Sequence, residues 1–265
     1  MVPIINIITL LALSIISVLL PIVGCLIVWR RTKVSIISFF IGMAVFTVCF
    51  IIAIATSLVA QYFIASPVVL TLVLSLRAGL VEEFGRFTAF KWLLKRRTAL
   101  GDGLMYGVGH GGMEVLLVYS LSMVSNLVLV LMFNFGGIEA LAAYAPDQVD
   151  LLIQSMQQLV QASPLFLTAG LVERLSALCV HISLSVIVFC AVRQRKWLYF
   201  VLAIALHTLT DASTALYTGG YVGVWGLEGI LVVIAACIAL IAWRIGRAYR
   251  QPVEPSAVAA PSALG

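Results

Sequence analysis

Long apolar stretches separated by short polar turns dominate the chain, and their lengths predict membrane-spanning helices. A bilayer core about 30 Å thick requires about 20 apolar residues, because each helical residue adds about 1.5 Å. The sequence therefore predicts seven spans, at residues 3–29, 34–60, 67–91, 102–135, 164–192, 197–217 and 221–243. The expected fold class is an all-α integral membrane protein, a polytopic bundle of about seven transmembrane helices.

The composition agrees with this fold class and excludes a soluble domain. Of the 265 residues, 63% are hydrophobic and only 10% are charged, and the mean hydropathy is +1.15. A soluble core cannot bury so much apolar surface. The net charge of +5 does not indicate a nucleic-acid partner, because the cations form short clusters between apolar runs instead of one phosphate-binding face.

The distribution of lysine and arginine predicts how the bundle is oriented. The clusters occupy alternate turns and the end of the last span, at Arg30, Arg31, Lys33, Lys91, Lys95, Arg96, Arg97, Arg193, Arg195, Lys196, Arg244, Arg247 and Arg250. The positive-inside rule places these turns in the cytoplasm. We expect the N-terminus outside, the C-terminus in the cytoplasm, and a multi-pass protein of a prokaryotic plasma membrane.

The rest of the chain is predicted to add little to this bundle. Residues 1–250 are expected to form one membrane-embedded domain, and the Pro-, Ala- and Ser-rich residues 251–265 a disordered cytoplasmic tail. In the outer loop, residues 147–162 carry apolar side chains at helical spacing opposite Gln and Asp. That pattern predicts a helix in the outer interface of the bilayer, and a plain connector is the other interpretation.

Ionisable residues inside the predicted spans are the strongest functional signal. Six of the eleven acidic residues and all three histidines lie there: Glu82, Glu83, Glu114, Glu173, Asp211, Glu228, His110, His181 and His207. Each ionisable group near the centre of a span costs about 2.5–3.5 kcal/mol. So many costly residues in one bundle indicate a shared function.

The spacing of these residues predicts that they meet. In GHGGMEV, His110 and Glu114 are one helical turn apart on the same face, and in HTLTD, His207 and Asp211 have the same spacing. Counted inward from the basic turns, Glu82, His110, His181 and His207 lie roughly 12–18 Å below the predicted cytoplasmic edge. Four different spans therefore bring these groups to one layer.

The stretch VEEFGR adds a charge partner to that layer. Arg86 follows Glu82 by four residues and Glu83 by three, so either carboxylate can pair with it on a helix. We expect the arginine to hold one glutamate ionised while the other takes up a proton. A glutamate that exchanges protons beside a histidine suits a general base acting on water.

These motifs resemble those of the intramembrane proteases that include the prenyl-protein (CAAX) endopeptidases and bacteriocin-processing enzymes. The matching residues are Glu82-Glu83 with Arg86, Tyr106 with His110, and His207 with Asp211, in the same order. The chain is more similar to the YhfC family of intramembrane proteases, through VEEFGR, GHGGMEV, VERLSALCVHIS and HTLTD, over residues 70–230. Two features depart from the wider group: Arg86 follows the glutamate pair after two residues instead of three, and Glu173 and His181 are additional.

The resemblance implies roles for individual residues. Glu82 or Glu83 would activate water with the help of His110, while His207 and Asp211 would stabilise the oxyanion of the tetrahedral intermediate. Supporting positions are then Arg86, Glu114 and His181. The same layer also suits a zinc ion, with ligands drawn from His110, His181, His207 and Glu114. Whether a cofactor is used stays open at this stage, with zinc and no metal as the two alternatives.

We therefore expect residues 1–250 to be the catalytic domain of an intramembrane peptidase that works within or next to the bilayer, near the cytoplasmic leaflet. Its partners would be the lipid bilayer and a membrane peptide, or a lipidated or hydrophobic peptide. Two other functions fit the same residues: a proton- or cation-coupled transporter and a non-catalytic membrane protein on a protease scaffold. The sequence shows no inverted repeat and no span broken by proline at mid-membrane, and both observations count against a transporter.

Overall fold

The structure, a computed structural model, describes residues 1–250. These residues form helices joined by short connections and contain no strand. The predicted tail, 251–265, lies outside the described residues. The long helices are α1 (Ile4–Thr32), α2 (Ile37–Phe63), α3 (Pro67–Thr88), α4 (Leu100–Glu114), α5 (Leu121–Tyr144), α7 (Pro164–Gln194), α8 (Trp197–Ala212) and α10 (Val224–Arg250). Shorter elements are α6 (Val149–Gln161), α9 (Ala215–Thr218), the π-helical turns η1 (Ala89–Leu93) and η2 (Val115–Ser120), and the 3₁₀ turn η3 (Pro146–Gln148).

The prediction of a polytopic all-α membrane protein is confirmed. Six helical segments within residues 1–250 are long and apolar enough to cross a membrane: Ile4–Thr32, Ile37–Phe63, Leu100–Tyr144, Pro164–Gln194, Trp197–Thr218 and Val224–Tyr249. The remaining predicted span corresponds to α3, whose 22 residues are long enough but carry Arg77, Glu82, Glu83 and Arg86. The charged residues therefore distinguish α3 from the six apolar segments, and they are candidate functional residues.

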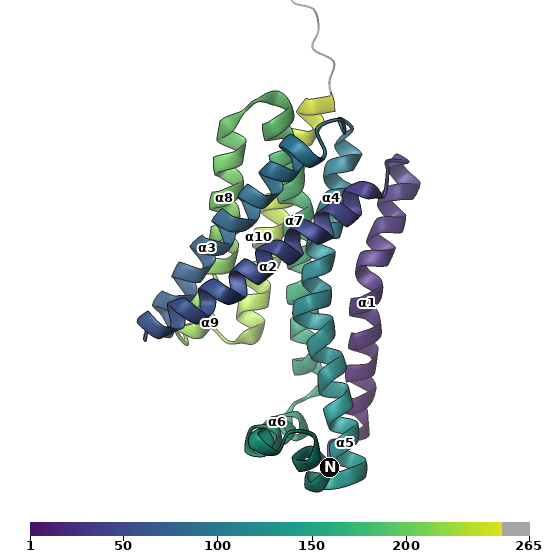
Figure 1. Cartoon of the computed structure of the whole chain (residues 1–265), viewed down its shortest axis with the longest axis vertical. Coiled ribbons are helices and arrows are strands. Elements are labelled where there is room, and N and C mark those ends of the chain that lie inside the picture. The colour runs from purple at the N-terminus through teal and green to yellow at the C-terminus, as the bar shows by residue number, and fades with distance from the viewer. Residues whose placement is uncertain (251–265) are drawn as a thin grey trace, which may run out of the picture.

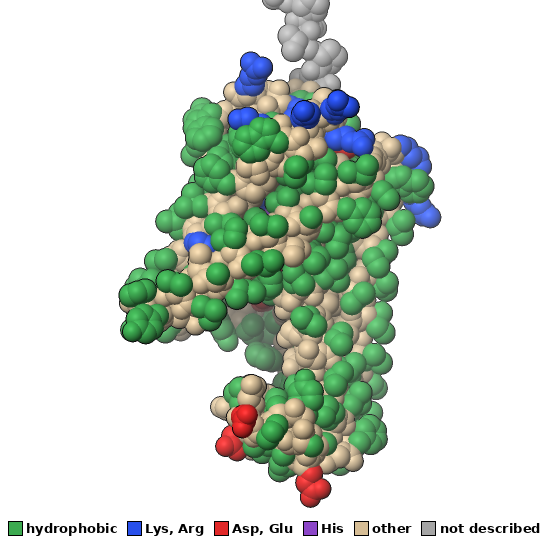
Figure 2. Space-filling model, in the orientation of Figure 1, with side chains coloured by type: hydrophobic (Ala, Val, Ile, Leu, Met, Phe, Trp, Pro, Cys, Tyr) green, Lys and Arg blue, Asp and Glu red, His purple; other side chains and the backbone are tan. Residues whose placement is uncertain are grey.

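Figure 2 shows most Lys and Arg side chains at one end of the molecule, and Asp and Glu exposed at the other. This separation is what the positive-inside rule uses. The orientation of the termini across a membrane stays a prediction.

The fourth predicted span, 102–135, is part of a longer rod. Helices α4, η2 and α5 follow one another without a loop from Leu100 to Tyr144, and the chain bends near the end of α5 at Gly137, whose φ is 67°. Figure 1 shows α5 running beside α1 beyond the rest of the bundle, with α6 at its tip. A helix therefore forms within 147–162, as the pattern indicated, while its place in a bilayer interface stays a prediction.

Side chains from α1 secure α6. The Asn6 side-chain amide donates hydrogen bonds of 2.8 and 2.9 Å to the carbonyl oxygens of Leu159 and Ala162, at the end of α6. Met156 is 1% exposed and belongs to a cluster that includes Leu10 of α1 and Val130 of α5. The segment between α5 and α7 is therefore bound to the bundle.

Helix α4 occupies the middle of the bundle because glycines let its neighbours approach. A Cβ on Gly109 would lie 2.0 Å from the carbonyl oxygen of Phe39 in α2, and a Cβ on Gly42 would lie 2.3 Å from the carbonyl oxygen of Tyr106 in α4. The two backbones are thus in direct contact, as small residues allow in membrane helices. This contact places His110, the next residue along α4, deep in the bundle with no exposed surface.

We predict that Gly109→Ala destabilises the protein by about 1–3 kcal/mol, because the new methyl group would force two backbones apart. Reversible unfolding in mixed detergent measures the change. Gly229→Ala in α10 is the matched control, since a Cβ there meets nothing within 4 Å and alanine favours a helix by up to about 1 kcal/mol. Equal stability of the two variants would contradict the proposed contact between α2 and α4.

Candidate active site

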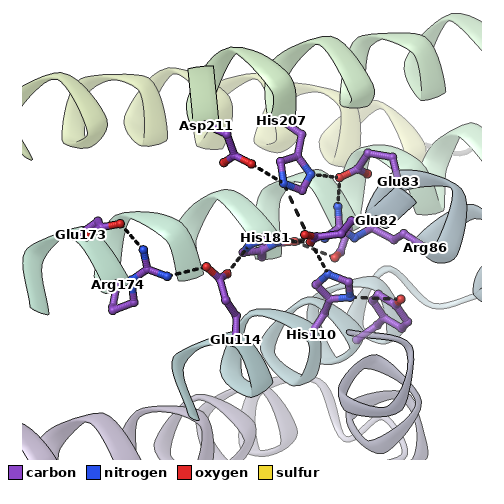
Figure 3. A network of polar contacts seen from close by, with 12 residues as sticks. Glu82, Glu83, Arg86, His110, Glu114, Glu173, Arg174, His181, His207 and Asp211 are labelled. Carbon is purple, nitrogen blue, oxygen red and sulfur yellow. Dashed lines mark hydrogen bonds and ion pairs between the residues drawn. The ribbon is translucent and has the colours of Figure 1, made fainter. Parts of the chain in front are cut away.

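Four helices bring the predicted site residues together in one network (Figure 3). Glu82, Glu83 and Arg86 come from α3, His110 and Glu114 from α4, Glu173, Arg174 and His181 from α7, and His207 and Asp211 from α8. All three histidines are buried, with exposed fractions of 5% or less. The depth count from the sequence anticipated this meeting of separate spans.

Glu82 stands at the centre of the network. Its Oε2 atom lies 3.0 Å from His110 Nε2, 3.9 Å from His181 Nδ1 and 3.9 Å from His207 Nε2. One carboxylate oxygen therefore faces imidazole nitrogens from three other helices.

Two of these imidazoles are held from behind by a second carboxylate. Glu83 Oε1 lies 2.7 Å from His207 Nδ1, and Glu114 Oε2 lies 2.5 Å from His181 Nε2. The other ring nitrogen of each histidine, Nε2 of His207 and Nδ1 of His181, faces Glu82. An outer carboxylate that fixes the orientation of a ring is typical of histidines that bind a metal ion.

His110 is held differently. Its Nδ1 atom is 3.5 Å from the Tyr106 hydroxyl oxygen, and its ring meets the Phe46 ring edge-on at 5.1 Å between centroids. An aromatic pocket therefore orients this histidine, and its Nε2 contacts Glu82.

The two adjacent glutamates have different environments. Glu83 has no exposed surface and forms an ion pair with Arg86, which is also fully buried. Arg86 Nη2 lies 3.0 Å from His181 Nδ1, and because a guanidinium only donates, that nitrogen accepts. The proton of a neutral His181 is then on Nε2, toward Glu114. Glu82, by contrast, is 15% exposed and has no arginine within ion-pair distance among the described residues.

A further ion-pair chain extends from His181 along α7. Glu114 Oε1 lies 2.6 Å from Arg174 Nη1, and Arg174 also pairs with its neighbour Glu173. Glu173 and Arg174 are neighbours in the sequence, but no local pattern links them to Glu114, which lies 60 positions before Arg174 on another helix.

A small cavity of about 60 Å³ adjoins the network. Its lining includes His181, His207, Asp211, Glu114 and Arg174. Since a water molecule occupies about 30 Å³ in the liquid, the cavity has room for one or two. The Asp211 side chain is 38% exposed, and its Oδ2 atom lies 3.6 Å from His207 Nε2. Water can therefore lie beside two of the three histidines.

The donor set that converges in space lacks two residues of the set expected for zinc, His110 and Glu114, and includes Glu82 instead. Ligand atoms of Glu82, His181 and His207 all lie within 4.8 Å of one another. His110 is not part of this group of three and contacts Glu82. Glu114 contacts His181 Nε2, the ring nitrogen that does not face Glu82. Which residues bind a metal stays a prediction.

The fold and this network define a multi-pass membrane protein whose buried histidines and carboxylates surround a water-sized cavity. The chain belongs to the family described as YhfC intramembrane metalloprotease, whose model matches residues 16–232.

A relative in Bacillus subtilis (strain 168), named "Uncharacterized membrane protein YhfC", is 33% identical over 165 residues. That match covers 62% of this chain and 64% of the relative, so the chain spans somewhat less than two thirds of the relative's length. No solved structure matches the chain.

We predict that Arg86→Met destabilises the protein by about 3–5 kcal/mol, because it leaves the Glu83 carboxylate buried without its cation. Unfolding in detergent measures the loss. Adding Glu83→Gln to this variant removes the unpaired charge and should restore a large part of the stability. The control is Arg77→Met on the same helix, since Arg77 is only half-buried and forms no ion pair with another described side chain. A similar loss for both single variants would rule out a special role for the buried pair.

Proposed function

We propose that this protein is an intramembrane endopeptidase that hydrolyses a peptide bond within or next to the bilayer, using water activated at the Glu82 cluster. The observation that carries the proposal is the convergence of His110, His181 and His207 on one carboxylate oxygen inside a membrane bundle. The family description, an intramembrane metalloprotease, supports the same class of reaction.

The depth of the cluster suggests where the substrate is cut. His207 follows Lys196, at the basic end of α8, by about eleven residues, which corresponds to roughly 16 Å along the helix. A peptide bond at that depth belongs to a hydrophobic or lipidated peptide near the leaflet on the basic side. We propose that this is the cytoplasmic leaflet.

The charges of the network favour a bound cation. Figure 3 shows five carboxylates, those of Glu82, Glu83, Glu114, Glu173 and Asp211, and two guanidiniums, those of Arg86 and Arg174. With neutral histidines, the negative charges outnumber the positive ones by three. An excess of this kind is costly in the membrane, and a divalent cation would remove most of it.

The residues present fit a catalytic zinc ion. Glu82, His181 and His207 would hold it, and two histidines with one glutamate plus a water molecule form a recurring zinc site of proteases. When bound, zinc would make its water acidic enough to lose a proton near neutral pH and would polarise the scissile carbonyl group. The hydrogen bond from Arg86 to His181 Nδ1 and a metal bond at that nitrogen exclude each other, so Arg86 would have to shift.

The other residues position these groups and move protons. Glu83 and Glu114 hold the rings of His207 and His181 in the required orientation. Asp211 faces the cavity and is placed to accept a proton from water. The resemblance implies that Asp211 stabilises the oxyanion. An ionised Asp211 carboxylate does not suit that role, because it would repel the negative charge of the oxyanion.

A second mechanism uses the same residues without a metal. The 3.0 Å contact between His110 Nε2 and Glu82 Oε2 favours Glu82 itself as the general base. Arg86 then keeps its hydrogen bond to His181. In both mechanisms Glu82 is the central group and Glu83 supports it.

We predict that Glu82→Gln and His110→Ala lower the turnover of membrane peptides at least about 100-fold, since Glu82 is the central group of both mechanisms and His110 contacts it at 3.0 Å. Glu83→Gln should lower it less, about 10–100-fold, because that side chain orients His207. The assay uses the purified chain in liposomes with a pool of hydrophobic peptides and detects new termini by mass spectrometry.

Glu139→Gln, an exposed change in α5, is the control and should leave turnover unchanged. Each variant must elute from gel filtration like the wild type. Wild-type turnover in Glu82→Gln would overturn the proposed protease mechanism in both forms.

We also predict that the purified chain binds one zinc ion, and that Arg174→Ala and Glu114→Gln weaken it about 10–100-fold because His181 loses its outer support. Competition with a coloured chelator measures the affinity without any substrate. Arg174→Lys should retain much of the affinity, since a cation still faces Glu114. Absence of stoichiometric zinc in a wild-type chain that still cleaves peptides in strong chelator would exclude the metal mechanism and leave Glu82 as the base.

A further inference from the structure

A second cavity lies at the basic end of the bundle, away from the histidine cluster. It has a volume of about 590 Å³ and is bounded by the end of α3, the turn after η1, and the junction of α7 and α8. Its lining residues are Phe87, Lys91, Lys95, Ala191, Val192, Arg193, Arg195, Trp197 and Phe200. Four cations and no carboxylate therefore line it.

One of the four cations builds the wall of this cavity. The Arg193 guanidinium donates hydrogen bonds of 2.7–3.1 Å to the carbonyl oxygens of Phe90, Leu94 and Arg97. These bonds tie the end of α7 to the turn that follows α3. These contacts with the backbone therefore fix one wall of the cavity.

The other three cations are available to a ligand. Lys91, Lys95 and Arg195 are exposed, and none forms an ion pair with another side chain in residues 1–249. Lys91 Nζ lies 5.4 Å from the Phe87 ring centroid, over the cavity wall. Arg195 is at the left-handed turn that ends α7, which directs the chain around the cavity.

The floor of the cavity is aromatic and apolar. Phe200 is fully buried, and its ring centroid lies 4.8 Å from that of Phe87 and 5.1 Å from that of Trp197. Trp197 itself is 60% exposed. Tryptophan at the end of a membrane helix is characteristic of the bilayer interface.

We infer that this cavity binds the headgroup of an anionic phospholipid. The phosphate group pairs with Lys91, Lys95 and Arg195. The first carbons of the acyl chains lie against Trp197 and Phe87, which Phe200 supports from beneath. Basic pockets between membrane helices bind anionic headgroups in this way. A soluble phosphate compound would use the cations but gain nothing from the apolar floor.

Such a lipid would contact three of the helices that carry the histidine cluster, because the cavity joins α3, α7 and α8. It would therefore stabilise the relative positions of Glu82, His181 and His207. This inference concerns a different site and does not depend on the proposed proteolysis.

The test is native mass spectrometry of the full chain in detergent, titrated with phosphatidylglycerol or with phosphatidylcholine. We expect the wild type to bind one phosphatidylglycerol in preference to phosphatidylcholine. The variant Lys91→Gln/Lys95→Gln/Arg195→Gln should bind phosphatidylglycerol about 10–100-fold more weakly, given the contribution of each basic residue near a membrane surface. If this variant does not fold, Lys91→Gln and Lys95→Gln are measured singly, and each should lower the affinity several-fold.

The matched control is Arg30→Gln/Arg31→Gln/Lys33→Gln. It removes three cations at the end of α1 that do not line the cavity, and Lys33, with a φ of 55°, has the same left-handed backbone as Arg195, with a φ of 56°. Equal losses in the two triple variants would show that only general surface charge attracts the lipid. Displacement of the lipid by millimolar inorganic phosphate would show a soluble-phosphate site. Either result, or no preference for phosphatidylglycerol, overturns the inference.

Discussion

The buried ion pair between Glu83 and Arg86 is the interaction on which the rest of the site depends. Neither side chain has any exposed surface, and a charge left alone in such surroundings costs several kcal/mol. Once Arg86 neutralises Glu83, that carboxylate can hold His207 at 2.7 Å, and the guanidinium can donate to His181. The pair thus orients two histidines from two other helices, and Glu82 is left without an arginine partner among the described residues, facing the three histidines.

Close backbone packing makes this arrangement possible. Polar groups of α4 and α7 meet because α4 is narrow where it passes α7: a Cβ on Gly107 would lie 2.6 Å from the Ile182 Cα, and one on Gly111 would lie 2.9 Å from the His181 Cβ. The resulting short distances let Glu83 contact Arg86 and His207, and let Arg86 contact His181, and hydrogen bonds in a low-dielectric interior are strong. Helix packing therefore controls the electrostatics of the site, because a wider α4 would separate His110 from Glu82.

Much of the fold and part of the site follow from the sequence, for identifiable reasons. Span lengths and basic turns depend on local composition, and the fixed rise per residue converts them into depth, so the convergence of Glu82 with three histidines could be predicted. The different environments of Glu82 and Glu83 could not, because Arg86 is at helical spacing from both and only the rotation of α3 against its neighbours decides between them. The contact of Arg174 with Glu114 was also missed, since no local pattern connects residues on α4 and α7.

The position of the small cavity indicates from which side water reaches the histidine cluster. Along α7, the lining residues run from His181 to Glu173, that is, away from the basic turn at Arg193. Water would then approach the cluster from the side opposite the Lys- and Arg-rich end, past Arg174 and Asp211. Arg193 ties α7 to the carbonyl groups after α3, and the cavity beside it is not lined by any residue of the histidine cluster. Under the proposed function, a hydrophobic peptide would therefore arrive laterally, between helices, while water would arrive through the small cavity.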